Sequence, residues 1–144
     1  SAFGSEQLYD FSMYTYGPFS SQVLSDLDAA EALGAVQVAR SDYGYAISPG
    51  PEAGRIQLLA KDFLEPIQKS IDKLFTDFGG FTAKELELRS TVIFAFQEAE
   101  KEGQPIEDLA DTVHEIKPGF TRAQIEEAIN ELTELGYIGH REAA

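Results

Sequence analysis

The chain lacks cysteine and contains only two histidines. With no cysteine in 144 residues, a disulfide framework and cysteine-based zinc or redox chemistry are excluded. His114 and His140 are far apart in the sequence, and neither has a second nitrogen ligand at metal spacing. We therefore predict that both histidines are surface or helix-end residues and that the protein holds no metal and no cofactor. The lack of cysteine also agrees with a cytoplasmic location.

Long apolar runs are missing as well. No stretch approaches the roughly 20 apolar residues that a membrane span needs, and the first residues carry neither the basic region nor the apolar run of a secretory signal. We predict no membrane contact and expect residues 1–9 to form a disordered leader. The rest of the chain is expected to fold, because 43% of all residues are hydrophobic and only 25% are charged.

Basic residues are scarce. Eleven Lys and Arg stand against twenty-five Asp and Glu, which gives a net charge of −14. Proteins bind nucleic acid largely by neutralising phosphates with Lys and Arg, so attraction of the whole surface to DNA is not expected. Only a local basic patch would support it. The acidity either keeps a small protein soluble or serves a basic partner.

What the chain does contain is an aromatic segment before a turn signal. Residues 10–16 alternate in the manner of a strand, and Gly17 and Pro18 are predicted to end it, because proline donates no ladder hydrogen bond. On a strand, Tyr14 and Tyr16 point to the same side. They either pack against the helical segment that follows later or form an aromatic contact patch, since tyrosine is favoured in interfaces.

A short helix and a hairpin are expected next. Ser20 or Ser21 caps a helix whose apolar residues recur at helical spacing, and Gly34 ends it. Residues 35–48 read as a hairpin with turn chemistry in its middle. Together, residues 10–50 predict an N-terminal winged-helix-like unit in which this hairpin is the wing.

The sequence Pro49-Gly50-Pro51 is the clearest break and the predicted domain boundary. Residues 51–80 have a helical apolar period and form a connecting helix. Pro66 lies inside this period, so we expect it to kink or split the helix.

Residues 81–144 are predicted to form the C-terminal helical, winged-helix-like unit. Thr82 and Glu85 have the spacing of a capping box, and the helix that they begin is apolar on most sides, which is typical of a central, buried helix.

Two more helices are expected in this half. Pro105 is predicted to open the first, and Thr121 with Gln124 repeats the capping-box pattern at the start of the second. Gly136 ends that helix, an apolar strand residue follows, and the tail from Gly139 is expected to fray.

The two helices that end at Leu33-Gly34 and Leu135-Gly136 match each other over their apolar stripes when one is shifted by 102 positions. A helix that packs by one stripe, stops at Leu-Gly and turns into a strand is the usual third helix of a winged domain. We therefore favour a mainly α chain with a small β component, arranged as a tandem winged-helix-like pair joined by long helices, over a single helical bundle.

The segments that carry this pattern resemble a known group. Residues 11–20, Phe-Ser-Met-Tyr-Thr-Tyr-Gly-Pro-Phe-Ser, and residues 116–121, Ile-Lys-Pro-Gly-Phe-Thr, resemble the YwgA-like family of uncharacterised bacterial and archaeal proteins. The likeness spans about residues 10 to 138. More distantly, the Gly-Pro turn before a helix is similar to the SocA-like (Panacea) antitoxin domain. The resemblance implies a winged-helix regulatory or interaction module and carries over no catalytic residue.

One feature departs from that family. A helix precedes the first strand there, whereas little of the sequence precedes Asp10 here. We expect the helix to lie upstream or to come from another chain; otherwise the apolar stripe that contains Val23 and Leu27 loses part of its cover.

No catalytic constellation is apparent. Ser20 and Ser21 have no neighbouring histidine, and the carboxylate pairs Asp26/Asp28 and Asp108/Asp111 read as solvated surface. We predict a non-enzymatic regulatory or antitoxin-like module that acts by contact with another protein, with homo-oligomerisation left open. The alternative is a winged-helix DNA-binding transcriptional regulator that acts as a dimer; a third reading is an acidic subunit of a chromosome-organising assembly. The candidate interaction residues are Tyr14, Tyr16, Gly17, Pro18, Phe19, Ser20 and Arg40.

Overall fold

A computed structural model of the chain describes residues 8–139. In this range 61% of residues are helical and 14% lie in strands, which form two small antiparallel sheets. The mainly helical chain with a small β component is therefore confirmed. The elements are β1 (Ser12–Tyr14), β2 (Gly17–Phe19), α1 (Ser21–Ala32), β3 (Val36–Ser41), β4 (Gly44–Pro49), α2 (Ala53–Leu59), α3 (Lys61–Leu64), η1 (Glu65–Ile67), α4 (Gln68–Phe78), α5 (Ala83–Glu102), η2 (Ile106–Asp108), α6 (Leu109–Ile116) and α7 (Arg122–Glu134).

These elements belong to two compact units. Within the described range, unit 1 comprises residues 8–11 and 20–75, and unit 2 comprises residues 12–19 and 76–139. The expected boundary at residues 49–51 lies inside unit 1, because backbone bonds tie that segment to the end of α1: Gly50 donates to Ala35 and Glu52 donates to Gly34, each at 2.9 Å.

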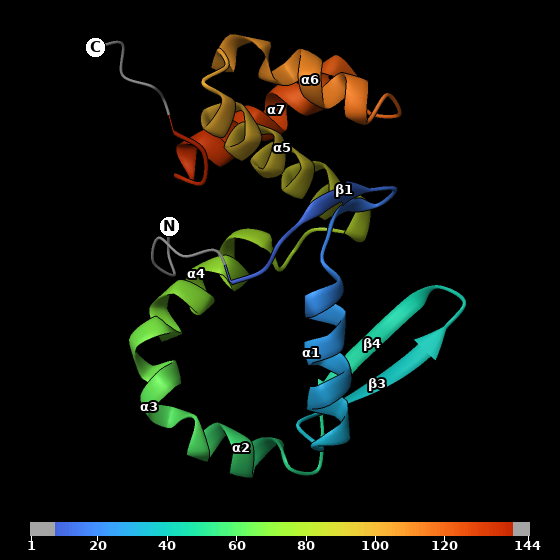
Figure 1. Ribbon diagram of the computed structural model, residues 1–144, viewed down its shortest axis with the longest axis vertical. Coiled ribbons are helices and arrows are strands. Elements are labelled where there is room, and N and C mark those ends of the chain that lie inside the picture. The colour runs from blue at the N-terminus through green and yellow to red at the C-terminus, as the bar shows by residue number, and fades with distance from the viewer. Residues whose placement is uncertain (1–7, 140–144) are drawn as a thin grey trace. The chain divides into compact units, whose positions relative to one another are not determined.

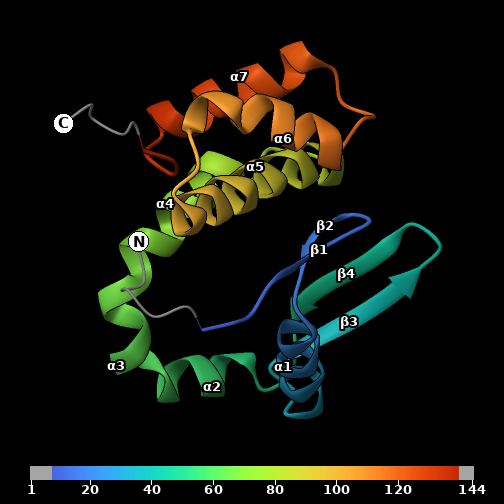
Figure 2. The same ribbon diagram turned by 45° about the horizontal axis from the view of Figure 1, so that its top comes forward.

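Unit 2 is built on a three-helix core. Figure 2 shows α6 and α7 side by side across α5. The central position predicted for the helix after Thr82 is confirmed, since α5 contributes five buried residues to this core. The buried apolar side chains are Leu88, Val92, Ala95, Phe96, Leu109, Ala110, Val113, Phe120, Ile125, Ala128, Leu132 and Ile138.

Both predicted capping boxes are present in unit 2. The Thr82 hydroxyl accepts from the Glu85 amide, and the Glu85 carboxylate accepts from the Thr82 amide in return. Thr121 and Gln124 do the same at the start of α7. Each box satisfies amides that a helix start leaves unpaired. Pro105, predicted at a first helical position, instead immediately precedes the short 3₁₀ turn η2.

The aromatic segment forms a hairpin rather than a single strand. β1 and β2 pair antiparallel, with Met13 opposite Pro18, and β2 packs on α5. The prediction that Gly17 and Pro18 end the strand is wrong: they are the first two residues of the second strand. Both strands of a two-stranded sheet are edges, and edge strands tolerate proline.

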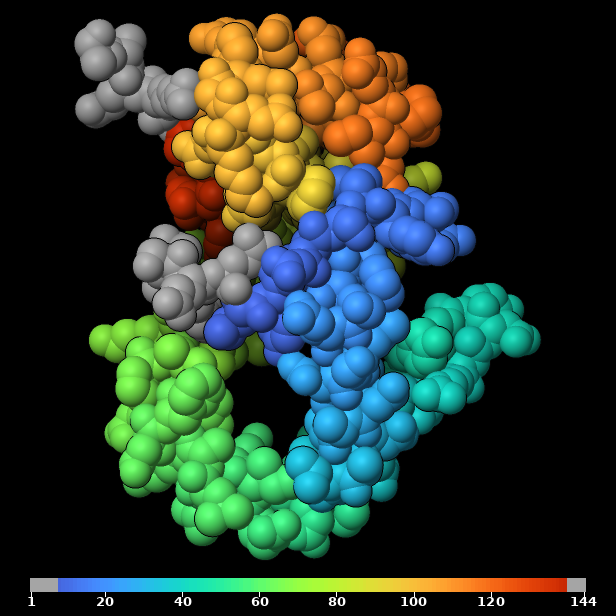
Figure 3. All heavy atoms as spheres, viewed as in Figure 1, coloured from blue at the N-terminus to red at the C-terminus, as the bar shows by residue number. Residues whose placement is uncertain are grey.

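Unit 1 consists of α1, the hairpin of β3 and β4, and an arc of helices from α2 to α4 (Figure 1). Figure 3 shows open space between α1 and this arc. Ser20 occupies the cap position of α1, but its side chain makes no cap hydrogen bond, so the predicted capping by Ser20 is wrong. Its buried Oγ has no hydrogen-bond partner within residues 8–139.

The split of the connecting helix is confirmed. Pro66 lies in the 3₁₀ turn η1 between α3 and α4, and a second break occurs at Ala60. A proline inside a helix removes a backbone bond and crowds the preceding turn, which accounts for the first break.

The glycine stops of α1 and α7 share one geometry. Gly34 and Gly136 have φ of 76° and 83°, and each helix closes with the same pair of backbone bonds beyond its last turn. This is the Schellman motif, which favours glycine because φ is positive. After Gly34 the chain enters β3, as expected. Residues 137–139 after Gly136 form no strand, so that part of the predicted repeat is wrong.

Candidate interaction surface

The β1–β2 hairpin presents three aromatic side chains from unit 2. The ring centroids of Tyr14 and Phe19 lie 5.5 Å apart, and Tyr16 is in the turn between the strands. Tyr14 is 63% exposed, Tyr16 83% and Phe19 38%. We call these three residues the aromatic hairpin surface. The packing of the two tyrosines against the helical segment 51–80 stays a prediction, because most of that segment belongs to unit 1.

Gly17 allows the hairpin to turn and to lie close to α5. Neither Thr15 nor Tyr16 has a positive φ, whereas Gly17 has φ of 112° directly after the turn. A Cβ at Gly17 would also lie 3.2 Å from the Ser90 hydroxyl. A side chain at this position would therefore meet both backbone strain and a steric contact.

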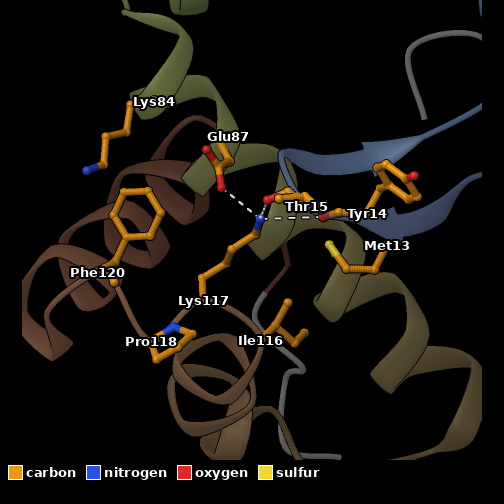
Figure 4. Close-up of a pocket in the computed structure, with 10 residues that line it drawn as sticks. Met13, Tyr14, Thr15, Lys84, Glu87, Ile116, Lys117, Pro118 and Phe120 are labelled. Carbon is orange, nitrogen blue, oxygen red and sulfur yellow. Dashed lines mark hydrogen bonds and ion pairs between the residues drawn. The ribbon is translucent and has the colours of Figure 1, made fainter.

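A buried lysine connects the hairpin to α5. Lys117 follows the last residue of α6, and its side chain is only 9% exposed. Its Nζ forms an ion pair with Glu87 of α5 at 2.7 Å and donates to the carbonyls of Thr15 and, at 3.5 Å, of Tyr14 (Figure 4). One cation thus joins α5, the turn after α6 and the tip of the hairpin.

The turn between α6 and α7 is itself fixed by local bonds. The Lys117 amide donates to Val113 at 2.8 Å, and the Phe120 amide donates to the Lys117 carbonyl at 3.2 Å. The Nδ1 atom of His114 lies 3.1 Å from the Phe120 carbonyl oxygen. His114 is therefore a structural residue near a helix end, as predicted, and the backbone that carries Lys117 is held on both sides.

A hollow of about 610 Å³ adjoins the hairpin within unit 2. Figure 4 shows Met13 and Tyr14 on one side of it and Lys84 and Phe120 on another. The Lys84 ammonium lies 5.6 Å from the centre of the Phe120 ring. The hollow is open and mixes apolar side chains with one exposed cation, so it widens the contact surface beside the aromatic residues.

The seven candidate residues do not all come together. Gly17 and Pro18 share the hairpin with the three aromatic residues. Ser20 and Arg40 belong to unit 1. Arg40 is exposed in β3, with its guanidinium carbon 5.9 Å from the centre of the Tyr45 ring opposite it. The candidate surface therefore comprises the hairpin without these two residues.

Sequence reasoning missed the residues that hold the surface in place. Lys117 stands between a helix and Pro118-Gly119, where a lysine is usually solvated, so nothing local signals its burial. Glu87 offered a signal, because it lies next to Leu88 and one turn before Thr91, both buried, and so borders the apolar face of α5. A carboxylate in that place is expected to need a buried cation.

The exposed faces of the two repeat helices are acidic. Helix α1 has no basic residue, and it exposes Asp26, Asp28 and Glu31. Helix α7 exposes Glu126, Glu127 and Glu134. Its one arginine, Arg122, is paired with Glu126 and Asp111, and the hydrogen bond to Glu126 raises the pKa of the guanidinium. Neither face has the positive charge that an approach to phosphates needs.

The Tyr9 hydroxyl donates to the Asp26 carboxylate at 2.6 Å, and this bond raises the pKa of Tyr9.

Within residues 8–139, no group of three His, Asp or Glu side chains is arranged to hold a metal ion. His140 and the expected leader up to residue 7 lie outside the described range. No helix between residues 8 and 139 is both long and apolar enough to cross a membrane.

Comparison of the chain with protein-family models, with curated proteins and with solved structures finds no match.

Proposed function

We propose that this chain is a non-enzymatic regulatory or antitoxin-like module that acts in the cytoplasm by binding another protein. The observation that supports it most is the contrast within the hairpin. Its aromatic side chains are exposed, while its backbone is tied down by the buried pair of Lys117 and Glu87. Exposed aromatic residues on a rigid support lose little conformational entropy on binding, and tyrosine is common among the residues that dominate interface energies.

The proposed architecture is a tandem winged-helix-like arrangement. In unit 1, α1 leads through Gly34 into the β3–β4 hairpin, which is the order of a helix followed by a wing. In unit 2, α6 and α7 are joined by the turn 117–121 and pack on α5, which is the order of a helix-turn-helix. The resemblance of residues 11–20 and 116–121 to the YwgA-like family agrees with this arrangement.

The charge of the second helix of that motif favours a protein partner. Recognition helices approach DNA through exposed side chains that meet phosphates and base edges. On α7 these side chains are mostly glutamates, with Arg122 already paired to two carboxylates. The exposed face of α7 therefore suits a partner with basic residues.

The test is affinity capture from the native host with three forms of the protein. We expect the wild type and a Tyr43→Ala control, in which the fully exposed tyrosine of the β3–β4 turn is removed, to retain the same protein partner. The double variant Tyr14→Ala/Tyr16→Ala should lose it with an unchanged melting temperature. Retention of the partner by the double variant would contradict the proposal. So would loss of the partner together with a clear drop in melting temperature, because the tyrosines would then support the fold and not the contact.

The second candidate function is a DNA-binding regulator that acts as a dimer, and one observation favours it. Arg40 is exposed on the β3–β4 hairpin and stacked near Tyr45, a position from which a wing contacts the phosphate backbone. Fluorescence anisotropy of duplex DNA at low and at physiological salt tests it. Binding that falls steeply with salt and is lost in Arg40→Ala would promote this function over the first.

A further inference from the structure

Unit 1 lacks the apolar core that unit 2 has. All twelve buried apolar side chains found within residues 8–139 belong to unit 2. Helices α1, α2, α3 and α4 contain no buried residue. A unit of this size depends on buried apolar surface to offset its chain entropy. Unit 1 therefore needs cover from outside itself.

The uncovered surface is large enough for a stable interface. Apart from tyrosines, eight large apolar side chains within residues 20–75 are between 41% and 74% exposed: Val23, Leu24, Leu33, Ile47, Leu58, Leu59, Phe63 and Phe75. At roughly 100 Å² for each, they offer on the order of 800 Å², which is what one partner contributes to a standard interface.

The two faces of unit 1 that carry these residues differ in charge. Helix α1 holds three carboxylates, Asp26, Asp28 and Glu31, and no basic residue. The α2–α4 arc holds four basic residues, Arg55, Lys61, Lys69 and Lys73, and four acidic ones, Asp62, Glu65, Asp72 and Asp77. Two copies of α1 would repel each other, whereas the arc carries no net charge and does not oppose the approach of α1.

The chain cannot bring these two faces together by closing at the junction between α1 and α2. Backbone bonds from Gly50 to Ala35 and from Glu52 to Gly34 lock that junction. A Cβ placed on Gly50 would lie 2.2 Å from the Gly34 carbonyl oxygen, so the two segments are already in the closest contact that backbone allows. Bringing α1 onto the arc of the same unit would break these bonds.

We propose that a second copy of this chain covers unit 1, with α1 of each molecule packed into the α2–α4 arc of the other. The contact is reciprocal, so two identical α1–arc interfaces form around a two-fold axis. This surface is separate from the aromatic hairpin surface of unit 2, and the two proposals stand independently.

Sedimentation equilibrium of the full chain tests the dimer with two single variants. Leu24→Glu places a charge on the apolar side of α1, and Phe63→Glu places one in the arc. Each is expected to weaken the dimer about tenfold or more. Tyr16→Glu, in the hairpin of unit 2, is the control and should leave the dimer intact. Circular dichroism checks that the helices of unit 2 remain folded.

Mixing the two variants distinguishes the reciprocal contact from other dimers. One α1–arc contact in a mixed pair combines two unmodified faces, so the mixture should dimerise more strongly than either variant alone. A dimer of two α1 faces would respond to Leu24→Glu only, and a dimer of two arcs to Phe63→Glu only; either result overturns the proposal. A wild-type protein that stays monomeric at all concentrations also overturns it.

Discussion

At the scale of single residues, the anchoring of the hairpin depends on Lys117. Its ammonium and the Glu87 carboxylate are both largely buried and 2.7 Å apart. Removing one partner of a buried pair leaves an uncompensated charge. We predict that Lys117→Met lowers the free energy of unfolding of unit 2 by about 3 kcal/mol, measured by urea denaturation with a probe in α5–α7.

Lys101 supplies the matched control, because it pairs with Glu98 at 2.7 Å but both side chains are well exposed. Lys101→Met should cost less than about 1 kcal/mol, since exposed pairs contribute little. Equal costs for the two substitutions would contradict the anchoring role of Lys117.

Gly17 provides a second test at this scale. Gly17→Ala combines a positive φ with a contact of 3.2 Å to Ser90, whereas Gly44→Ala meets the same kind of φ, 125°, with open space around it. Strain of the left-handed region costs about 1–2 kcal/mol. We therefore predict that Gly17→Ala destabilises the protein by that amount or more and Gly44→Ala by that amount at most. Thermal unfolding of both variants measures the difference, and a smaller cost at Gly17 would contradict the close approach to α5.

The anchoring residues also show what a sequence leaves open. The ends of helices α1 and α7 at Gly34 and Gly136 were predictable, because a helix often ends at a residue with positive φ and glycine adopts that angle readily. The burial of Lys117 was not predictable, because the hairpin that covers it contacts it at Thr15, which lies 102 residues away in the chain.

At the scale of elements, the helix starts of α5 and α7 differ in their response to pH. Hydrogen bonds from the Thr82 amide and hydroxyl lower the pKa of Glu85 below its ordinary value. A carboxyl whose pKa is lower in the folded state adds stability that is present above the unfolded pKa and lost as pH falls through the folded pKa. The Thr121–Gln124 box has a neutral amide in that place.

We therefore predict that the cost of Thr82→Ala shrinks as the solution is acidified below the ordinary pKa of a glutamate. The cost of Thr121→Ala should change little over the same range. Chemical denaturation at neutral and acid pH measures both variants. A parallel pH response of the two substitutions would show that Glu85 does not gain stability from its hydrogen bonds with Thr82.

The elements also divide by how well the sequence specified them. Helices α5 and α7 begin at capping boxes, α1 and α7 end at glycines, and the β3–β4 hairpin follows from its turn residues. All of these signals act locally. Strand β2 could not be predicted from such local signals, because proline within a segment usually argues against a strand. A two-stranded hairpin leaves both strands as edges, and this context decided the outcome at Pro18.

At the scale of the whole molecule, the two units contrast in what they bury. Unit 2 has a continuous core around α5, and unit 1 presents its apolar side chains to the outside. Composition does not reveal this contrast, because the apolar residues are spread along the entire chain. We propose one protein-binding surface on each unit, and the net charge of −14 disfavours nucleic acid as the partner of either.

We propose above that the aromatic hairpin surface binds a protein. The most direct measurement replaces Tyr16 with a photo-crosslinking amino acid in the native host, with the same replacement at the exposed position of Lys101 as the control. We predict that irradiation gives one defined protein adduct from position 16 and none from position 101. Identical adducts from both positions, no adduct at position 16, or an adduct with nucleic acid would contradict it.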